Sequence, residues 1–498
     1  ESFRADAIGE ATTPHLLAAA KSGMRFAQHH AIAAWTVPNI IALLTGLSPF
    51  AQGVHARGQT VDPALDLPLE RLSEAGWTVA GLQAFMGIDV YGHLGLSVDP
   101  GADLNGWLSR HAAGTDPFLL WYHYTDTHLP YAPKAPGVRE RALALAADEA
   151  ARARAEQVSA QPAIRAGSLA FEPGDLKPIR ALYDANIGEF DVWFGAFWRF
   201  FQASGLARDT ILVVTADHGD ELLERGHVGH ASTTLDGHLY EEVLHVPLFL
   251  WLPDGTGAGR TVAAPTDHLD VMPTLLARLG RTRDLPPDAE GRDLAAPVMP
   301  ARPWMGLTSR GGFAEPDPLH IDRFIAAMAE DGLKLHLWQQ AGRAVRTALY
   351  DLRTDPGETR DVAADHPERA RAMTERLEAR LHGMRPPSPL AGPQGDGAGP
   401  VAWVRPAGSR VVGYADVAAG FALEWSGDPD AAYAVEYRAG EGALTLSGRL
   451  QAAGTHLAFG PVERSYWERF VLPYGVVRLR VGAGGTSWSD WITMRLVP

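Results

Sequence analysis

The sequence predicts an α/β protein in which a mostly parallel central sheet is sandwiched by helices, with a β-sandwich added at the C-terminal end. Apolar runs of strand length alternate with helical patterns through residues 1–383, which is typical of a parallel sheet covered on both faces. A Pro- and Gly-rich stretch follows. After it, apolar and polar residues alternate with a period of two. The pattern divides the chain into an α/β unit at 1–383, a linker at 384–400 and a sandwich at 401–498.

The expected elements follow one another as this fold requires. Apolar runs predict buried strands at 77–82, 118–123, 210–215 and 246–251. Helices are expected at 13–22, from Pro38 onward, and at 67–76, 138–160, 181–201 and 267–279. Proline suits the first turn of a helix, where its missing N–H has no partner to lose. The segment 138–160 is rich in Ala, Arg and Glu, which indicates a solvated helix. Strands of the sandwich are expected at 421–425, 433–437, 476–481 and 488–496.

Composition narrows the classes of partner and chemistry. The chain has 498 residues, of which 46% are hydrophobic, and this is enough for more than one core. Its formal net charge of -15 argues against nucleic acid as a partner, because phosphate backbones are repelled. The absence of cysteine excludes disulfides, thiolate metal sites and a Cys nucleophile.

The sequence contains no run of about 18 consecutive apolar residues, so no membrane-spanning segment is expected. No signal peptide is visible either. The opening segment, Glu1 to Asp6, begins as if a strand had just ended. We therefore expect further residues before Glu1, where a signal or an anchor would lie.

The pair Asp217-His218 is the strongest chemical signal. It follows the expected strand 210–215, and ligands of an open α/β sheet bind beyond the carboxyl ends of its strands. A carboxylate and an imidazole side by side at that edge reach a single metal ion. A bare Asp-His dipeptide in a loop usually has no role, but the position at a strand end favours a metal site.

Thr36 stands just before the helix that begins near Pro38. Taken alone, a threonine at this position is a helix N-cap. The free N–H groups and the positive dipole of a helix N-terminus also suit a bound anion. A threonine hydroxyl becomes a nucleophile only when a metal ion or a base activates it.

Histidines are concentrated after Asp217 and near the end of the strand 118–123. They are His123, His128, His218, His227, His230 and His238. Neutral imidazoles bind metal, whereas protonated ones stabilise an oxyanion or protonate a leaving group. About half of such residues are expected to be ordinary loop residues. We expect His128, His230 and His238 to carry function ahead of His123 and His227.

Several separated motifs, in the same order, resemble those of the sulfatase-like branch of the alkaline phosphatase superfamily. The segments that carry the resemblance are Glu1 to Gly9, Thr13 to Leu16, Gly23 to Phe26, Trp35 to Asn39, Leu43 to Pro49, Thr215 to Asp220, Leu239 to Glu242, His245 to Leu248, Asp267 to Leu276, Leu349 to Leu352 and Asp355 to Glu358. The likeness covers residues 1–383 and implies the fold of that superfamily. Residues 401–498 resemble fibronectin type III or immunoglobulin-like modules, with Trp425, Tyr437 and Trp491 expected in the core.

The departures from the sulfatase pattern carry information about the reaction. Sulfatases of this family have Cys or Ser at the nucleophile position, oxidised to formylglycine and followed by Pro-Ser-Arg. This chain has Thr36, which has no route to that aldehyde hydrate, and Ile40 in place of the arginine. The lysine expected after the strand 77–82 is not evident in Leu82 to Phe85. Threonine at this position resembles members that cleave phosphoesters or transfer phosphoryl groups. Glu1 in place of Asp resembles the phosphoglycerol and phosphoethanolamine transferases.

The resemblance implies a set of roles for the candidate residues. The expected ligands of one divalent metal ion (Mn, Mg, Ca or Zn) are Glu1, Thr36, Asp217 and His218. A second metal is less favoured, because the Asp126-Thr127-His128 spacing departs from that of two-metal relatives. The expected catalytic residues are Thr36 as nucleophile and His128, His230 and His238 for proton transfer. The candidates for binding substrate are Arg4, Asn39, His128 and His238.

The expected function is a metal-dependent hydrolase or transferase that acts on phosphate mono- or diesters through a phosphothreonine intermediate. Two alternatives stay open: an atypical sulfatase, and a catalytically impaired binding protein. The expected substrate is a small-molecule or a glycan- or lipid-linked phosphoester, selected by loops in 85–115, 130–175 and 225–240. The expected compartment is the periplasm or the extracellular space, and the C-terminal sandwich is the candidate surface for a homo-oligomer.

Overall fold

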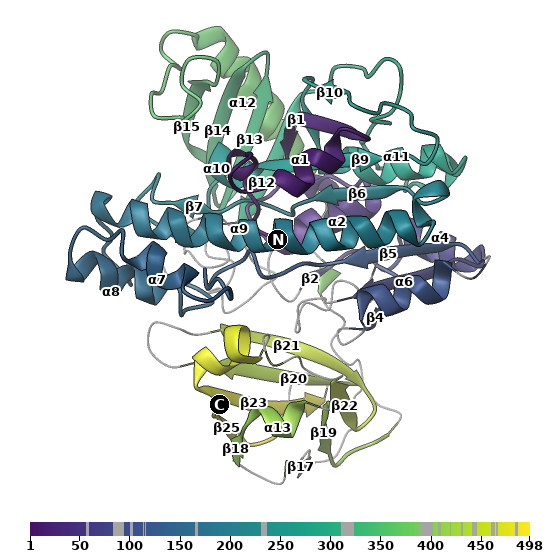
Figure 1. The fold of residues 1–498 in the computed structure, drawn as a ribbon, viewed down its shortest axis with the longest axis vertical. Helices are drawn as coiled ribbons and strands as arrows, with labels where there is room; N and C mark the ends of the chain where they lie inside the picture. Colours follow the sequence, from purple (N-terminus) through teal and green to yellow (C-terminus); the bar gives the residue numbers. More distant parts are fainter. Residues whose placement is uncertain are drawn as a thin grey trace.

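The computed structural model of the chain describes most of residues 1–498 (Figure 1). The residues outside the description are 56–58, 83–93, 100–102, 113, 115, 165–167, 231–236, 310–322, 387, 390–401, 407–409, 419, 430–431, 441–445, 460–463, 465–466 and 484–486. Most of the expected linker and parts of the expected specificity loops, including Gln83 to Phe85 and residues 231–236, therefore lie outside the described residues.

The central sheet has the strand order β10-β1-β9-β6, and β11 also pairs with β1. Its strands are β1 (Met24–His30), β6 (Leu212–Thr215), β9 (His245–Trp251), β10 (Thr261–Val262) and β11 (Thr266–Asp267). β1 runs parallel to β10 and β11, whereas β9 runs antiparallel to both β1 and β6. A second sheet, of β3 (Thr78–Leu82), β4 (Ser97–Asp99) and β5 (Phe118–Tyr122), is parallel throughout. The predicted α/β class is confirmed, with β9 as the antiparallel member that makes the first sheet mixed.

Helices cover both faces of the central sheet. Alternate side chains along β9 pack into two different hydrophobic clusters, one on each face. Phe249 and Trp251 pack into one hydrophobic cluster, and Leu248 and Leu250 into another. The first cluster is completed by α1 (Pro14–Ala20), α7 (Val138–Leu143), α8 (Glu149–Val158) and the long α9 (Leu176–Ala203). On the other side lie α2 (Thr36–Thr45), α4 (Pro68–Glu74) and α11 (Val271–Arg278). Since successive strand residues point to opposite faces, the sheet is buried on both.

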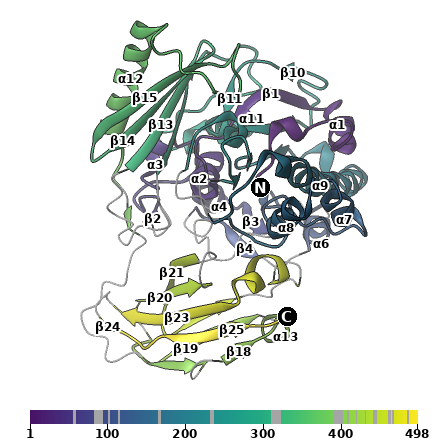
Figure 2. The same cartoon turned by 90° about the vertical axis from the view of Figure 1, so that its left-hand side faces the viewer.

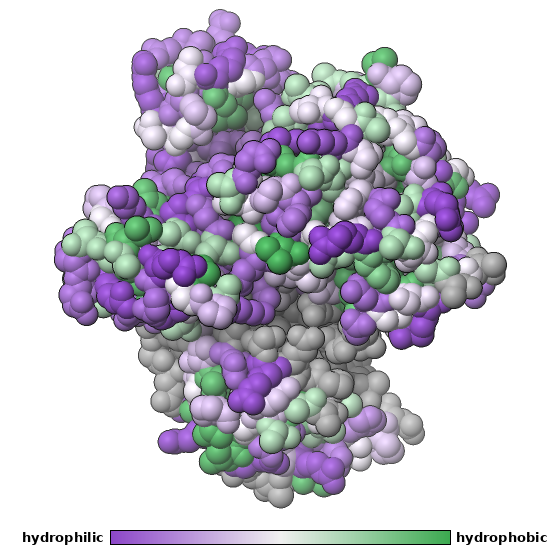
Figure 3. All heavy atoms as spheres, in the orientation of Figure 1, coloured by the Kyte–Doolittle hydropathy of each residue, from purple (hydrophilic) through white to green (hydrophobic). Residues whose placement is uncertain are grey.

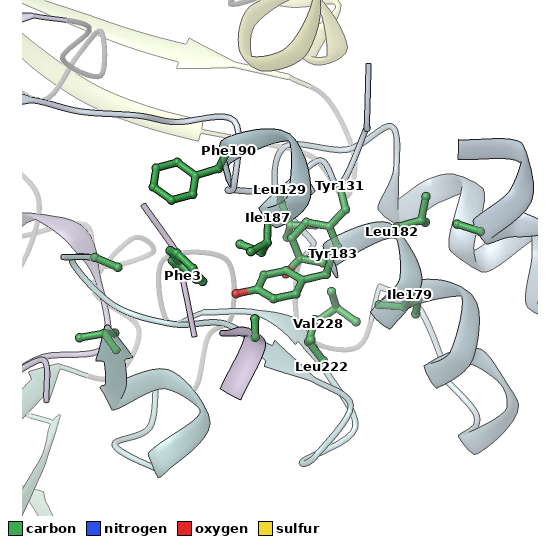
Figure 4. Close-up of a cluster of buried hydrophobic side chains, with 14 of the residues drawn as sticks. Phe3, Leu129, Tyr131, Ile179, Leu182, Tyr183, Ile187, Phe190, Leu222 and Val228 are labelled. Atoms are coloured by element: carbon green, nitrogen blue, oxygen red, sulfur yellow. The ribbon is translucent and has the colours of Figure 1, made fainter. Parts of the chain in front are cut away.

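The segment expected to be one solvated helix is two helices, α7 and α8, which contribute to the core. Leu143 and Val158 are fully buried in the cluster that α9 covers. Figure 4 shows part of this cluster, with the hydroxyl end of Tyr183 beside Phe3. The Tyr183 hydroxyl donates to Ser2 O and accepts from Arg4 N–H, both at 2.9 Å. The core therefore fixes the backbone that carries Glu1.

An antiparallel sheet at one end of the α/β unit was not predicted from the residue pattern (Figure 2). It has the order β12-β13-β14-β15. The strands are β12 (Trp304–Ser309), β13 (Arg323–Glu330), β14 (Leu333–Gln340) and β15 (Arg343–Asp351), and α12 (Pro367–His382) packs on one face. The other face packs against Ala31, Ala34 and Leu239 of the α/β unit.

The C-terminal residues form two further sheets that share one core, in agreement with the predicted β-sandwich (Figures 1 and 2). One has the order β17-β19-β22, and the other the order β18-β25-β23-β20-β21 with β24 beside β23. Trp425 is buried in the shared core and Tyr437 packs against it, as expected. Trp491 differs from the expectation: it is outside the core, and the guanidinium carbons of Arg438 and Arg480 each lie 4.8 Å from the centre of its ring.

The strands of these C-terminal sheets are β17 (Trp403–Arg405), β18 (Arg410–Val412), β19 (Phe421–Trp425), β20 (Ala432–Ala439), β21 (Leu446–Ala453), β22 (His456–Phe459), β23 (Val476–Ala483), β24 (Ser487–Trp488) and β25 (Ile492–Leu496). The remaining short elements are η1 (Ala5–Ala7), α3 (Pro49–Gln52), β2 (Gln59–Thr60), α6 (Leu104–Ala112), η2 (Pro173–Asp175), η3 (Leu206–Arg208), β7 (Glu221–Leu222), β8 (Val228–Gly229), α10 (Glu241–Leu244), η4 (His268–Asp270), η5 (Thr282–Asp284), β16 (Ser388–Pro389), α13 (Tyr414–Val417), η6 (Trp467–Val471) and η7 (Leu472–Tyr474).

The start of the expected linker belongs structurally with the α/β unit. β16 pairs with β2, and Arg385 forms ion pairs with Asp62 at 3.2 Å and Asp288 at 2.7 Å. The division of the chain at residue 383 therefore stays a prediction, and these contacts favour a later boundary.

Among the described residues, no helix is both long enough and apolar enough to cross a bilayer. On the face of the molecule that Figure 3 shows, apolar and polar side chains are interspersed.

Candidate active site

Asp217 and His218 lie just beyond the carboxyl end of β6, where the sheet presents its loops. The Asp217 carboxylate is anchored on one side only, because Oδ1 accepts from Ser2 N–H at 3.1 Å and from His218 N–H at 2.9 Å. Its Oδ2 accepts no hydrogen bond within the described part of the chain. The next position requires glycine, because a Cβ at Gly219 would lie 2.4 Å from the carbonyl oxygen of Glu242.

The imidazole of His218 is oriented by the backbone. Its Nδ1 lies 2.9 Å from the Gly219 carbonyl, which only accepts, so Nδ1 carries the proton and Nε2 presents a lone pair. Burial lowers the pKa of His218, although the Asp217 carboxylate opposes this, so the ring is neutral. Nε2 lies 3.3 Å from Thr36 Oγ1, 3.3 Å from Asp217 Oδ2 and 3.4 Å from Glu1 Oε1. Lone pairs from three segments of the chain therefore converge on one point.

Glu1 is the second carboxylate of this cluster, and His123 joins it there. Nε2 of His123 lies 2.6 Å from Glu1 Oε2, and both side chains are buried. Burial lowers the pKa of His123 to about 3. The Thr127 hydroxyl donates to the backbone carbonyl of Glu1 and fixes its position from the β5 side.

The two carboxylates oppose each other electrostatically. Burial, and then the nearby Asp217, raise the pKa of Glu1 well above its ordinary value. Burial also acts against ionisation of Asp217, but the interaction with His218 outweighs it and holds the pKa of Asp217 well below the ordinary value. Two adjacent buried carboxylates are both ionised only when a cation lies between them.

The residues fit a divalent metal ion. Two groups place their ligand atoms within 4.8 Å of one another: Glu1, His123 and Asp217, and Glu1, His218 and His230. Carboxylate oxygens and neutral imidazoles suit Mn²⁺, Mg²⁺, Ca²⁺ or Zn²⁺. The unpartnered Asp217 Oδ2 and the lone pair of His218 are the features that a cation would satisfy.

Thr36 is the first residue of α2, and only 7% of its surface is exposed. Trp35, the N-cap residue, provides no side-chain cap. Because the first N–H groups of a helix have no partner within it, they remain directed at the space beside Thr36. The structure thus brings the Thr36 hydroxyl, the His218 imidazole and a helix N-terminus together.

Asn39 differs from its expected role in binding substrate. Its amide oxygen accepts from Ile32 N–H at 2.9 Å and Ala33 N–H at 3.1 Å. Its nitrogen donates to the carbonyls of Ala33 at 2.8 Å and Trp35 at 3.0 Å. A fully buried amide with four backbone partners has no capacity left for a ligand, so Asn39 instead fixes the loop that presents Thr36.

His230 and His128 lie beside the cluster. The rings of His230 and His218 have centroids 4.0 Å apart, and those of His128 and His230 are 5.1 Å apart. Nδ1 of His230 lies 2.7 Å from Asp220 Oδ1, while Asp220 Oδ2 accepts from the Tyr131 hydroxyl at 2.7 Å. Burial raises the pKa of Asp220 to about 6. Asp220 therefore fixes the ring of His230, which belongs with Glu1 and His218 to one of the two groups of potential metal ligands.

Two further candidates, and the residue considered for the less favoured second metal, are engaged by other protein groups. His238 is engaged by Glu221, with Nε2 2.8 Å from Oε2, and is in neither metal group. Arg4 is neutralised by Asp6 at 2.8 Å and Glu224 at 2.7 Å, which leaves its charge compensated within the protein. Asp126, considered for a second metal, forms an ion pair with Lys134.

Sequence reasoning ranked His123 too low and gave no role to Asp220. His123 ends an apolar strand and resembles an ordinary half-buried histidine, because the carboxylate beside it lies at the far end of the sequence. Asp220 offered a local signal, since it follows the Asp217-His218-Gly219 turn, but its partners Tyr131 and His230 are known only from the fold.

Comparisons with known proteins indicate a likeness to sulfatases. The sulfatase family model matches residues 102–281, which include Asp217 and His218. Arylsulfatase K of Mus musculus is 26% identical over 220 residues, which is 42% of this chain and 37% of that protein. The multifunctional alkaline phosphatase superfamily protein PehA of Trinickia caryophylli is 28% identical over 202 residues, or 36% of this chain and 37% of that protein. The match thus spans well under half the length of these relatives.

A solved structure extends the likeness in fold. The phosphonate monoester hydrolase of Agrobacterium radiobacter superposes with a TM-score of 0.59 at 22% identity, covering 79% of this chain and 96% of that one. The chain is thus similar to the sulfatase-like branch of the alkaline phosphatase superfamily, in sequence across the family match at residues 102–281 and in fold over 79% of its length.

Proposed function

We propose that this protein is a metal-dependent phosphoester hydrolase or phosphotransferase with Thr36 as its nucleophile. The observation that carries the proposal is the position of the Thr36 hydroxyl: at the N-terminus of α2, 3.3 Å from the lone pair of His218, beside two buried carboxylates. A threonine hydroxyl there has the activating surroundings that a nucleophile requires.

Glu1, Asp217 and His218, with Thr36, are the residues that hold the divalent ion in this proposal, and His123 lies within reach of the same group. Such an ion lowers the pKa of a nearby hydroxyl and draws charge from phosphoryl oxygens. The protein supplies the geometry: α2 fixes Thr36, the Gly219 carbonyl fixes the tautomer of His218, and Ser2 N–H fixes Asp217.

The proposed reaction has two displacements at phosphorus. Thr36 Oγ1 forms a bond to phosphorus as the bond to the leaving alcohol breaks, and the Thr36 proton passes to solvent or a nearby base. The leaving oxygen departs with the electron pair and takes a proton from water; His128, expected to supply this proton, is neutral because burial lowers its pKa to about 3. Water, or an acceptor alcohol, then attacks the phosphothreonine and releases Thr36. The N–H groups at the start of α2 stabilise the phosphoryl oxygens.

A sulfatase is the second candidate, favoured by the matched family model and by the identity to arylsulfatase K. Thr36 argues against a sulfatase, because threonine cannot become the aldehyde hydrate that sulfatases of this family use. The PehA and phosphonate hydrolase likenesses support action on phosphorus esters. We further propose a small-molecule or glycan- or lipid-linked substrate, a periplasmic or extracellular location, and the C-terminal sheets as the candidate oligomer surface.

Matched aryl substrates test this proposal. The metal-loaded protein is assayed on an aryl phosphate monoester, diester and sulfate that share one leaving group. We expect the phosphate esters to be cleaved faster, Thr36→Ser to retain activity, and Thr36→Val to lose at least about 10³-fold in kcat while metal stays bound. A preference for the sulfate would establish the sulfatase instead. Metal-loaded protein that cleaves none of the three would indicate a binding protein.

A further inference from the structure

Three buried polar side chains form a chain of contacts that ends on the backbone of Asp217. His29 is on β1, Thr266 on β11 and His268 in η4, and each is at most 1% exposed. The parallel ladder pairs His29 directly with Thr266. Their contacts form a chain: Thr266 Oγ1 to His29 Nδ1 at 3.0 Å, His29 Nε2 to His268 Nδ1 at 3.1 Å, and His268 Nε2 to the Asp217 carbonyl at 2.8 Å.

The chemistry of its last acceptor fixes the direction of this chain. A backbone carbonyl only accepts, so Nε2 of His268 carries a proton. Nε2 of His29 and Nδ1 of His268 lie 3.1 Å apart, so the two nitrogens share a single hydrogen, and in a neutral His268 that hydrogen cannot be on Nδ1. Nδ1 of His268 is then an acceptor, and Nε2 of His29 donates to it. Nδ1 of His29 in turn accepts from the Thr266 hydroxyl. Every donor points toward Asp217.

We propose that Thr266, His29 and His268 form a positioning relay that fixes the backbone of the metal-ligand pair Asp217-His218. The relay ties two segments, β1 and the continuous β11–η4 stretch, to the one carbonyl between the two ligand side chains. Ser2 N–H and His218 N–H hold the Asp217 carboxylate, whereas His268 donates to the Asp217 carbonyl. Outer partners of this kind orient ligands and commonly change metal affinity about 10–100-fold when removed.

The relay is more than packing of the core. A pair of imidazoles in an apolar interior costs free energy unless each nitrogen has a partner, and here all four nitrogens have one. Simple filling of space would be served better by leucine or phenylalanine. This inference rests on the proposed function only in taking Asp217 and His218 as metal ligands.

The ring tautomers are the first test, and they are independent of activity. Nitrogen-15 NMR of the full chain with labelled histidine, assigned with His29→Gln and His268→Gln, reports which ring nitrogen carries hydrogen. The relay predicts that both His29 and His268 are neutral and protonated at Nε2 near neutral pH. A proton on Nδ1 of either ring, or a charged ring, would overturn the proposed direction.

A matched pair of substitutions tests the effect on the metal. Glutamine places its amide nitrogen near the position of Nε2, whereas asparagine places its amide near Nδ1. We expect His268→Gln to hold Mn²⁺ or Zn²⁺ within about threefold of the unchanged protein and His268→Asn to bind it at least about tenfold more weakly, measured by titration calorimetry. Equal losses in the two variants at equal thermal stability would show a structural role only. If the unchanged protein binds none of Mn²⁺, Mg²⁺, Ca²⁺ and Zn²⁺, the proposed function fails, and the tautomers alone then decide on the relay.

Discussion

One nitrogen atom, Nε2 of His218, faces three oxygens that come from distant parts of the sequence. Glu1, Thr36 and Asp217 each place an oxygen 3.3 to 3.4 Å from it. The arrangement is stable only when protons or a cation lie among the lone pairs, because like partial charges at this separation repel one another. The divalent ion that we propose would satisfy these oxygens and the imidazole together.

Replacing Asp217 by asparagine tests this account. The amide oxygen in the place of Oδ1 still accepts from Ser2 and His218, so the fold is kept, but the amide nitrogen in the place of Oδ2 cannot bind a cation. We expect Asp217→Asn to weaken metal binding at least about 100-fold with little change in thermal unfolding. Asp126→Asn is the matched control, since that carboxylate pairs with Lys134. Equal metal contents in both variants, measured by elemental analysis, would contradict the assignment.

At the scale of residues, the sequence predicted site residues best where a few neighbouring residues form the motif. Asp217-His218 and Thr36 could be recognised by their positions at the ends of predicted elements. The fold then brings Thr36 within hydrogen-bond distance of His218. Arg4, Asn39 and His238 satisfy the same residue-type criteria, yet each is engaged by other protein groups. Whether a polar side chain is already satisfied depends on neighbours far away in sequence, which no local pattern reports.

At the scale of elements, the antiparallel sheet is joined to the α/β unit by a buried charge cluster. Lys334 of β14 is fully buried, with Nζ 2.8 Å from Glu241 of α10 and 3.1 Å from Glu358. Glu358 also pairs with His336 at 2.9 Å, and Glu241 with His30 at 2.9 Å. Burial opposes ionisation of both carboxylates, but the charge of Lys334 outweighs it. The pKa of Glu241 is held well below its ordinary value, and the pKa of Glu358 is also lowered.

Removing the lysine should be costly because it leaves two buried carboxylates without their partner. We expect Lys334→Met to lower the free energy of unfolding by about 3–5 kcal/mol, measured in urea near neutral pH. Lys134→Met is the control: its ion pair with Asp126 is half-exposed and should contribute about 0–1 kcal/mol. A loss below about 1 kcal/mol for Lys334→Met would contradict a stabilising role for the cluster.

The same cluster predicts a pH dependence. Groups whose pKa is lowered by folding stabilise the protein above their unfolded pKa, here the ordinary value of 4.5 for Glu241 and Glu358, and lose that contribution as the pH falls through the folded values. The unchanged protein should therefore lose stability on acidification below pH 4.5 more steeply than the Glu241→Gln/Glu358→Gln/Lys334→Met triple variant. Parallel pH profiles of urea unfolding for the two would count against this linkage.

Elements were predicted well where their apolar pattern is strong and uninterrupted. β3, β5, β6 and β9 lie where apolar runs indicated strands. β1 was missed because Met24 to His30 carries Arg, Gln and two histidines in a strand that is nevertheless central, since His29 is satisfied by Thr266 and His268. The antiparallel sheet was missed because Lys334 and His336 interrupt the apolar pattern of β14, and they are buried only through Glu241 and Glu358.

For the whole molecule, the boundary between the α/β unit and the C-terminal sheets determines which truncated form of the α/β unit folds by itself. Truncation to residues 1–400 keeps β16 and Arg385 with its ion pairs, whereas truncation to 1–383 removes them. We expect the longer form to retain metal binding and most activity on small aryl phosphates, and the shorter form to unfold at a lower temperature in calorimetry. Loss of metal binding in the 1–400 form would show that the C-terminal sheets are part of the site.

The central claim, that Thr36 attacks phosphorus, is tested most directly by the stereochemical course of the reaction. A phosphorothioate ester made chiral by isotopic labelling is hydrolysed in labelled water by the metal-loaded protein. Each in-line displacement inverts the configuration at phosphorus. Attack by Thr36 followed by attack of water therefore predicts overall retention. Overall inversion would mean a single displacement by water and would contradict a phosphothreonine intermediate.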